Sequence, residues 1–309
     1  MILTCSQRTD ICAFYSDWLL RRFREGFVDV RNPYAPRSVQ RILLDPGQIE
    51  AMIIMTKNPA PLLPHLQTLS AIPLGFQITI TPYPAELEPG IPDKRKIIAA
   101  FRECARQLGA RRVILRYDPI FFTKTWDLAW HQRAFQRLCR QLEGACHQVI
   151  ISELDWMRNT RRHQKELKAL PPDAKRFSLL AESLVPIGRQ FGMRLQMCAE
   201  SPEHAAPGIV RRSCIDAQWI EQISGLRLRY PQGKARPHCD CLAVTDIGEY
   251  NCCLHRCRYC YANFDETQLK ERVRAHDPAS SLLIGQPQPD DQIRIKKQPV
   301  FRQIGLFSS

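Results

Sequence analysis

The chain alternates short apolar runs rich in β-branched residues with longer stretches in which apolar residues recur at helical spacing. We expect strands at residues 2–5, 52–56, 76–81, 113–117, 149–152, 194–198 and 242–246. We expect helices at 14–24, 94–108, 127–142, 174–191, 216–223 and 264–275, and a hairpin at 28–31 and 39–44. Strands that alternate with helices are typical of βαβ units, so the pattern predicts an α/β fold with a parallel sheet.

The length of 309 residues falls in the range that a single α/β barrel occupies. We therefore predict a TIM-like, partly closed barrel. We assign residues 1–230 to this barrel and residues 231–309 to a cysteine-rich C-terminal segment that closes it. The proline-containing tail after Asp277 is expected to be an irregular wrap.

Polar side chains follow almost every predicted strand. In a barrel the carboxyl ends of the strands form one mouth, which is the usual place for an active site. Charges beside buried strands are costly unless they are paired or used. We assign catalytic and substrate contacts to Arg8, Asp10, Arg116, Asp118, Glu153 and Glu200. We assign cofactor contacts to Thr56, Lys57, Asn58 and Tyr259.

Three cysteines, Cys253, Cys257 and Cys260, lie close together in one loop after the last predicted strand. Grouped thiolates are soft ligands that select zinc, copper(I) or an iron–sulfur cluster. Structural zinc sites need four ligands, usually from two cysteine pairs, whereas this loop offers three. A 4Fe–4S cluster held by three thiolates keeps one iron open for a small molecule. The alternative is a zinc or structural cluster site in which Cys252 or a distant thiol is the fourth ligand.

A second metal site is predicted from four further cysteines: Cys198, Cys214, Cys239 and Cys241. Cys198 ends a predicted strand and Cys214 precedes a helix. Four thiolates close either a structural zinc site or a full iron–sulfur cluster without an open iron. The alternative is that Cys198 and Cys214 are small core residues, since free cysteine is among the most buried residue types.

The composition bears on partners and on the compartment. A net charge of +13 favours a polyanionic partner such as nucleic acid, with basic residues concentrated at 158–176, 211–236 and 294–297. Solvated helix faces explain such clusters as well. No apolar run approaches about 18 residues and the start lacks a signal pattern, so we expect a cytoplasmic protein with no membrane partner. Thirteen cysteines without such a signal indicate metal or redox chemistry.

The cysteine loop resembles that of radical S-adenosylmethionine (SAM) enzymes, which reads Cys-x3-Cys-x-aromatic-Cys, with Tyr259 in the aromatic place. The sequence of residues 261–263 also resembles the motif of proteins related to spore photoproduct lyase. Radical SAM barrels begin with a strand, this loop and a helix, and here that unit comes last. We therefore expect a circularly permuted barrel in which the terminal unit closes beside the strand at Ile2.

Nearly the whole chain is similar to a bacterial family catalogued as domain of unknown function 1848. The resemblance rests on residues 6–11, 56–59, 116–119, 198–200, 214–216 and 246–248 and on the cysteine loop. Gln7 and Cys12 depart from the arginine and proline expected there. The resemblance implies an iron–sulfur cluster like that of radical SAM proteins, although the Gly-Gly-Glu stretch that holds the SAM amino group is missing.

These features support three interpretations. The first is an enzyme with a 4Fe–4S cluster and SAM, in which a 5′-deoxyadenosyl radical removes hydrogen from a substrate and a small donor such as flavodoxin or ferredoxin supplies electrons. The second is a nucleic-acid-binding module that a metal stabilises, whose affinity falls with salt. The third is an iron–sulfur redox protein. Charges at so many strand ends favour the enzyme.

Overall fold

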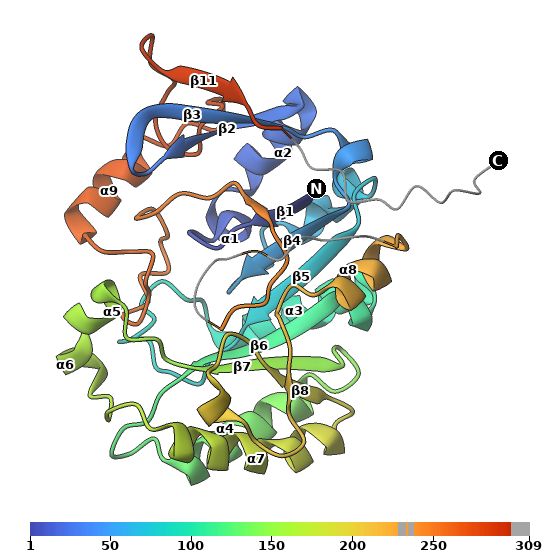
Figure 1. Cartoon of the computed structure of the whole chain (residues 1–309), viewed down its shortest axis with the longest axis vertical. Helices are drawn as coiled ribbons and strands as arrows, with labels where there is room; N and C mark the ends of the chain where they lie inside the picture. Colours follow the sequence, from blue (N-terminus) through green and yellow to red (C-terminus); the bar gives the residue numbers. More distant parts are fainter. Residues whose placement is uncertain (228–232, 234–237, 298–309) are drawn as a thin grey trace.

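Eight parallel strands form the sheet at the centre of the molecule, counted over the residues that the structure describes (Figure 1). The structure is a computed structural model that describes residues 1–227, 233 and 238–297. In the order in which they lie side by side, the strands are β10 (Thr245–Asp246), β1 (Ile2–Cys5), β4 (Ala51–Thr56), β5 (Leu74–Thr79), β6 (Val113–Ile120), β7 (Gln148–Glu153), β8 (Arg194–Met197) and β9 (Val210–Arg211). The predicted α/β fold with a parallel sheet is confirmed.

The sheet is open in its hydrogen bonding. Its order begins at β10 and ends at β9, and within the described ranges no ladder joins these two strands. The predicted barrel closure is therefore not seen. Both edge strands are very short, which leaves few backbone groups to form such a ladder. The boundary predicted between residues 230 and 231 lies outside the described residues, as does part of the basic stretch at 211–236.

The last strand of this sheet along the chain lies beside the first. β10 pairs in parallel with β1, with Leu3 opposite Thr245 and Thr4 opposite Asp246. This confirms the expected position of the terminal unit next to the strand at Ile2. The strand predicted at 242–246 is shorter than expected, because the Leu242 N–H donates to the carbonyl of Ile215 outside any ladder.

The helices of the structure alternate with the strands. They are α1 (Ile11–Phe14), α2 (Ser16–Glu25), α3 (Lys94–Leu108), α4 (Leu128–Gln141), α5 (Arg158–Arg162), α6 (Gln164–Leu167), α7 (Ala174–Gln190), α8 (Ala217–Ser224) and α9 (Glu266–Arg274). Short 3₁₀ turns lie at Pro46–Gln48, Leu63–Leu69, Ala110–Arg112 and Pro202–His204. The six helices predicted from apolar spacing are confirmed within a few residues, whereas the short helices α1, α5 and α6 were not predicted.

Aspartate side chains cap the starts of the longer helices. A carboxylate at this position accepts an orphan backbone N–H and lies at the positive end of the helix dipole. The capping residues of α3, α4, α7, α8 and α9 are Asp93, Asp127, Asp173, Asp216 and Asp265. Local sequence therefore fixes where these helices begin.

Two hydrophobic clusters lie on the two faces of the sheet, because successive strand residues point to opposite sides. The larger cluster contains Leu3, Met52 and Ile54 and extends beneath the helices α2, α3, α4 and α7. The smaller cluster contains Ile2, Ala51 and Ile53 together with Trp219 of α8. A Cβ atom at Gly75 in β5 would lie 2.9 Å from the Trp219 ring, so glycine there lets α8 pack directly on the sheet.

A smaller sheet joins a segment near the start of the chain to one near its end (Figure 1, blue and red). The predicted hairpin is confirmed as the antiparallel pair β2 (Phe27–Asn32) and β3 (Ala35–Leu43). The strand β11 (Gln292–Ile295) pairs in parallel with β3. The expectation of an irregular tail was therefore wrong for this segment, where polar and apolar residues alternate. An ion pair between Arg31 and Asp291 helps to hold the two ends together.

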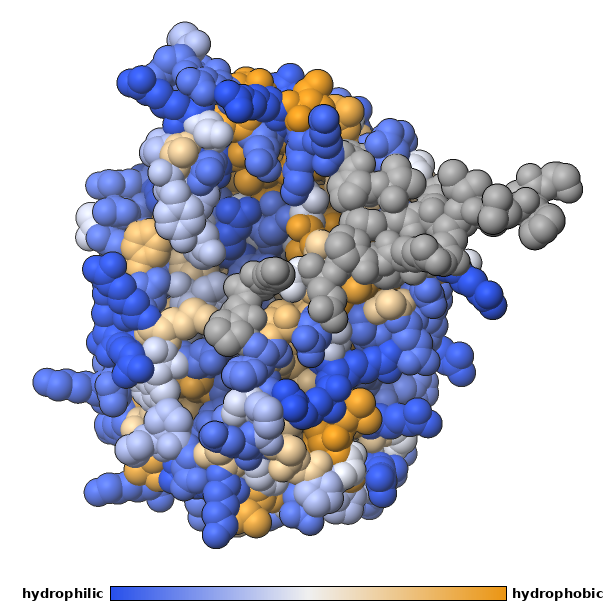
Figure 2. Space-filling model, in the orientation of Figure 1, coloured by the Kyte–Doolittle hydropathy of each residue, from blue (hydrophilic) through white to orange (hydrophobic). Residues whose placement is uncertain are grey.

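Hydrophilic residues cover most of the face shown in Figure 2, and hydrophobic residues appear there in separate patches. Within the described part of the chain, none of the helices combines the length and the apolar character that crossing a bilayer would require.

His131 in α4 makes the stability of the fold sensitive to acid. Its fully buried ring donates from Nε2 to the carbonyl of Phe121 at 3.1 Å, so Nδ1 is free to accept from the Tyr117 hydroxyl at 3.1 Å. Burial lowers the pKa of His131 from 6.5 to about 4. The native state therefore favours the neutral ring, and the associated stability is complete above pH 6.5 and is lost as the pH falls toward 4.

We predict that the free energy of unfolding falls by about 3 kcal/mol between pH 7 and pH 4 through this group alone. Urea unfolding at a series of pH values measures it. His131→Gln is expected to be less stable at pH 7, with a gap from wild type that narrows as the pH falls. The exposed His147→Gln variant serves as the control and should follow wild type. A constant gap for His131→Gln would contradict the prediction.

Candidate functional site

Segments from several strand ends meet the cysteine loop at one edge of the sheet. The carboxyl ends of parallel strands lie on the same edge, where open α/β sheets bind their ligands. Asp10 follows β1, Lys57 follows β4 and Gly90 lies beyond β5, and each hydrogen-bonds to His255 or Tyr259 of the cysteine loop. The predicted convergence of strand ends is thus present around the loop.

Asp10 is the buried hub of this contact. Its Oδ2 accepts from the Thr56 hydroxyl at 3.0 Å, the Lys57 backbone N–H at 2.7 Å and His255 Nε2 at 2.8 Å. Its Oδ1 caps α1 by accepting from the Ala13 N–H at 2.9 Å. One carboxylate therefore fixes the ends of β1 and β4 and the cysteine loop relative to one another.

Glu88 lies between two lysines next to the loop. Lys57 Nζ is 3.0 Å from Glu88 Oε1, and Lys94 Nζ is 2.7 Å from Glu88 Oε2. The Tyr259 hydroxyl also donates to Glu88 and accepts from Lys57 Nζ at 2.8 Å. Tyr259, predicted as a cofactor contact, is thereby held by side chains from two other segments.

The lysines determine the ionisation of this group. Burial by itself raises the pKa of Glu88, but Lys57 and Lys94 outweigh it and lower its pKa to about 2. Burial lowers the pKa of Lys57, but Glu88 and the Cys257 thiol outweigh it, so the pKa of Lys57 lies above its usual value. Both groups are therefore charged at neutral pH, and Lys57 presents a fixed cation beside the cysteine loop.

Backbone contacts hold the cysteine loop in place. The Asn263 side chain donates to the Cys253 carbonyl at 2.6 Å, and the Ala262 N–H donates to the Cys260 sulfur at 3.3 Å. The Gly90 N–H donates to the His255 carbonyl at 3.0 Å. A Cβ atom at Gly90 would lie 2.0 Å from the Leu254 carbonyl oxygen, so the loop packs against a position that only glycine can fill.

Burial raises the pKa of each of the thiols of Cys253, Cys257 and Cys260, and Cys260 lies near enough to Cys253 and Cys257 to raise the pKa of both further. They do not form a group whose sulfurs all lie within 4.8 Å of one another. Such spacing fits a cluster in which each thiolate binds a different iron. Cys257 and Tyr259 pack in an apolar cluster with Tyr83, which would shield a metal centre from water.

Arg8 and Asp246 join the ends of β1 and β10. Arg8 Nε donates to Asp246 Oδ1 at 2.9 Å, and the Gln7 backbone N–H donates to Asp246 Oδ2 at 2.6 Å. The side chain of Ser6 adds a hydrogen bond to the same carboxylate at 3.2 Å. Arg8, predicted as a catalytic residue, is thus already engaged in a structural ion pair.

Arg116 and Asp118 form another pair, at the end of β6. Arg116 Nε lies 3.0 Å from Asp118 Oδ2, and a terminal nitrogen of Arg116 donates to Gln77 at 2.8 Å. Ser152 donates to the other oxygen of Asp118. Arg116 also hydrogen-bonds to the thiol of Cys214, so it lies between the predicted mouth and the second group of cysteines.

Two glutamates share one histidine at the ends of β7 and β8. His204 Nε2 lies 3.0 Å from Glu153 Oε2 and 3.5 Å from Glu200 Oε2. The Glu153 backbone N–H also donates to Glu200 Oε1 at 2.8 Å. Burial raises the pKa of Glu200 to about 7, and the charges of Asp155 and Asp118 add to this effect. Glu153 and Glu200, which were predicted as site residues, thus both contact His204, which was not predicted.

The second group of cysteines converges on the opposite face of the sheet from the large core. The ligand atoms of Cys198, Cys214 and Cys241 all lie within 4.8 Å of one another and are buried. The Cys198 and Cys241 thiols, which hydrogen-bond to the Cys214 sulfur, and Arg116 lower the pKa of Cys214. The structure therefore contains a buried cysteine triad that could bind a metal, made of three of the four cysteines that the sequence predicted, whereas the Cys239 sulfur is not part of this group.

Several site residues were missed because their roles depend on contacts distant in sequence. They are Glu88, His204, Asp246 and His255. His255 and Asp246 carried a usable signal, since one lies within the cysteine loop and the other ends the strand before it. Glu88 lies in a loop and His204 ends a 3₁₀ turn, and neither follows a recognisable motif. Asn58 lies beside Lys57, where its backbone N–H donates to the Thr56 hydroxyl at 2.9 Å.

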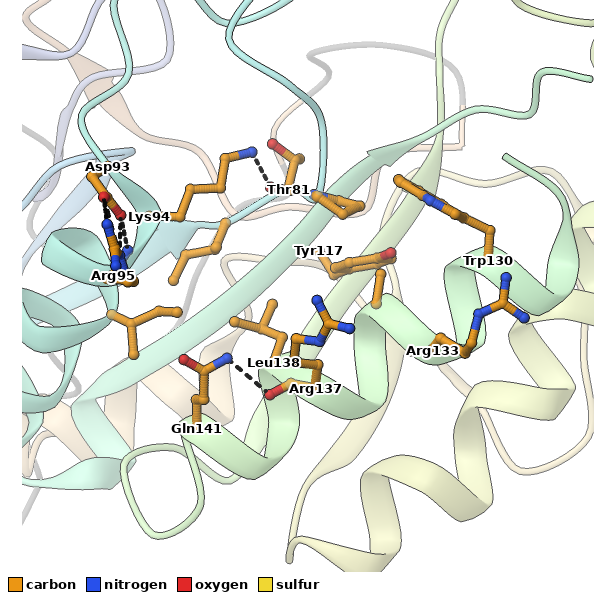
Figure 3. A pocket seen from close by; sticks show the side chains of 14 residues that line it. Thr81, Asp93, Lys94, Arg95, Tyr117, Trp130, Arg133, Arg137, Leu138 and Gln141 are labelled. Atoms are coloured by element: carbon orange, nitrogen blue, oxygen red, sulfur yellow. Dashed lines mark hydrogen bonds and ion pairs between the residues drawn. The ribbon is translucent and has the colours of Figure 1, made fainter. Parts of the chain in front are cut away.

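A groove of about 370 Å³ lies between α3 and α4 and adjoins this edge, because Thr81 and Lys94, which contact Glu88, help to line it (Figure 3). Trp130, Arg133 and Arg137 of α4 line one side, and Arg95 of α3 lies on the other. The cysteines do not line this groove. We therefore place the chemistry at the strand ends, where thiols and charges meet.

We predict that Glu88→Ala lowers the free energy of unfolding by roughly 3–5 kcal/mol, because it leaves Lys57 and Lys94 near one another without their shared carboxylate. The urea midpoint at neutral pH measures the loss. The matched control is Glu86→Ala in the same loop, where an exposed side chain should leave the midpoint unchanged. Equal midpoints for the two variants would show that the Glu88 ion pairs do not stabilise the fold.

Comparison with known proteins agrees with the sequence resemblance. A search of curated proteins finds no match to this chain. The model of the family described as "Domain of unknown function (DUF1848)" matches residues 2–262, which include every strand of the large sheet and the cysteine loop. The chain therefore belongs to the DUF1848 family.

Proposed function

We propose that the protein is a radical SAM-type enzyme whose 4Fe–4S cluster is bound by Cys253, Cys257 and Cys260. The observation that carries the proposal is the position of this three-thiol loop, directly after a parallel strand and surrounded by charged residues from neighbouring strand ends. We further propose that the open sheet is a permuted radical SAM barrel, with residues 1–230 as its main part and the C-terminal segment completing it.

In this proposal the cluster and the protein chain have separate roles. When bound, such a cluster supplies the electron that cleaves SAM, and the resulting radical removes hydrogen from a substrate. The chain supplies three thiolates and leaves one iron without a protein ligand. Tyr83, Tyr259 and Phe121 pack beside Cys257 and would exclude water from this position. Asp10 and Gly90 would hold the loop in a fixed geometry before the cofactor binds.

Lys57 is the best-placed residue to hold SAM. Its ammonium group lies beside the loop, remains charged and is 16% exposed. A cation of this kind suits the carboxylate of the methionine part of SAM. Thr56 and Asn58 offer neighbouring oxygen atoms for its amino group, in place of the missing Gly-Gly-Glu stretch.

The remaining strand-end charges would face the substrate. Asp118, Glu153 and Glu200 lie on β6, on β7 and after β8, farther along the same edge of the sheet. Phe121 and Leu154, which follow β6 and β7, pack in one cluster with Cys257. His204 hydrogen-bonds to Glu153 and forms an ion pair with Glu200, contacts that would let this group hold or release a proton. We assign to these residues the orientation of the substrate, with Arg8 and Arg116 supporting their segments.

The surface of the cysteine loop suits an acidic electron donor. Arg256 and Arg258 lie on the loop and pair with Glu266, and Arg258 also pairs with Glu166. Arg162 of α5 adds a further positive charge beside the loop, where it donates to the Phe264 carbonyl. Exposed aromatic residues, Tyr261 and Phe264, flank the loop. Such a surface complements a small acidic protein of the flavodoxin or ferredoxin type.

We predict that protein purified without oxygen is brown, contains iron and sulfide in near-equal amounts, and forms 5′-deoxyadenosine slowly from SAM after reduction by dithionite. Replacing Cys253, Cys257 and Cys260 by Ala should remove the SAM-reactive cluster and this product. Cys104→Ala, which changes a buried core cysteine of α3, is the control and should retain both. Reduced, fully loaded protein that neither changes its paramagnetic spectrum with SAM nor forms the product would be an electron carrier instead.

We also predict that Lys57→Met keeps its iron and sulfide but binds SAM roughly 10–100-fold more weakly, since it loses one charge-assisted hydrogen bond. Glu88 retains Lys94 as its partner in this variant, which preserves the fold. Titration of the reduced cluster with SAM, followed by paramagnetic resonance, measures the affinity. Lys96→Met, on the exposed side of α3, is the matched control. Unchanged SAM affinity in Lys57→Met would rule out this role.

A further inference from the structure

We propose that Cys198, Cys214, Cys239 and Cys241 bind one Zn²⁺ ion as a closed tetrathiolate site, separate from the cysteine loop. This site lies on the face of the sheet that α8 covers. It does not depend on SAM chemistry, because zinc is not redox-active and a site with four protein ligands has no open position.

The distances between the sulfurs identify a single metal ion. The Cys198 and Cys241 sulfurs are 3.8 Å apart, and the Cys214 and Cys241 sulfurs are 3.4 Å apart. A tetrahedron with Zn–S bonds of about 2.3 Å has edges of about 3.8 Å. In a 4Fe–4S cluster each thiolate binds a different corner iron, which holds the sulfurs farther apart. The compact triad therefore fits one tetrahedral ion.

Cys239 provides the fourth ligand. Its side chain packs against the same apolar cluster, and its thiol interacts with those of Cys198 and Cys241. The Cys239 sulfur lies outside the group of three sulfurs that are all within 4.8 Å of one another, and binding of the ion would bring it in. The Cys-x-Cys spacing of Cys239 and Cys241 allows both thiols to face one point. A triad alone would leave the tetrahedron incomplete, whereas four thiolates close it.

Neighbouring groups compensate the charge of the site. Zinc with four thiolates carries two negative charges, which burial makes costly. The Cys214 backbone N–H donates to the Cys198 sulfur at 3.3 Å. Arg116, also on this side of the mouth, hydrogen-bonds to Cys214. These donors favour thiolates over thiols, as the second shell of a metal site does.

Zinc is favoured over mononuclear iron because the affinity of a given site for divalent metals is greater for zinc than for iron(II). The ion would connect the end of β8, the residues before α8 and the segment that leads into β10. The Leu242 N–H already bonds to the Ile215 carbonyl at 3.0 Å across this junction. The zinc ion would thus fix the segment from which the cysteine loop continues.

Metal analysis of the full-length protein tests the proposal. Wild-type protein expressed with ample zinc and iron is expected to contain about one zinc per chain in addition to its iron. Cys214→Ser should lose this zinc while keeping the iron and sulfide, and Cys253→Ala should lose iron while keeping zinc. Cys104→Ser, a buried cysteine outside both groups, should change neither metal.

X-ray absorption at the zinc edge of the wild-type protein gives a measurement that does not depend on variant folding. We expect four sulfur ligands at about 2.3 Å. Zinc bound by nitrogen or oxygen, a disulfide within the group, or the loss of iron from Cys214→Ser without loss of zinc would each overturn the proposal. Because zinc and iron are counted separately, failure of the zinc site is distinguishable from failure of the radical SAM function.

Discussion

The need to pair buried charge at the carboxyl edge of the sheet governs the architecture of the site. Asp10 shows the principle most clearly, since its carboxylate joins the ends of β1 and β4 to the cysteine loop through hydrogen bonds to Thr56, Lys57 and His255. Buried charges of this kind are tolerated only with several partners, and each partner fixes another segment. The charged mouth is therefore also what positions the thiols.

The two cysteine groups differ in spacing and therefore in the chemistry they suit. The loop thiols are spread apart and lie beside the fixed cation Lys57, and Cys253 and Cys260 are partly exposed. The second group is compact, buried and enclosed by apolar residues. Under the two proposals, the loop would hold an open cluster and the second group a closed structural ion, so the two sites would not compete for the same metal.

Local patterns in the sequence account for most of the fold. Aspartate caps and apolar spacing locate the long helices, and the polar residue that follows each strand locates the edge of the site. The features that the sequence does not predict depend on which strands pair and on contacts between residues that are distant in the sequence. Arg8 was predicted as a catalytic residue from its place after β1. Its ion pair with Asp246 depends on the pairing of β10 with β1, which no local pattern predicts. Glu88 and His204 belong to no recognisable motif. The strand β11 forms because it pairs with β3, and the local pattern of β11 does not predict this partner.

The first strand of the chain lies inside the sheet, between β4 and β10. The neighbouring strand β4 is complete once residue 56 has been synthesised. The strand β10, on the other side of β1, is complete only when residue 246 has been synthesised. During translation the backbone groups of β1 on that side therefore lack their native partner, and an unpaired strand edge is prone to misassociation. The order of synthesis thus delivers the cysteine loop after the strand ends that it contacts.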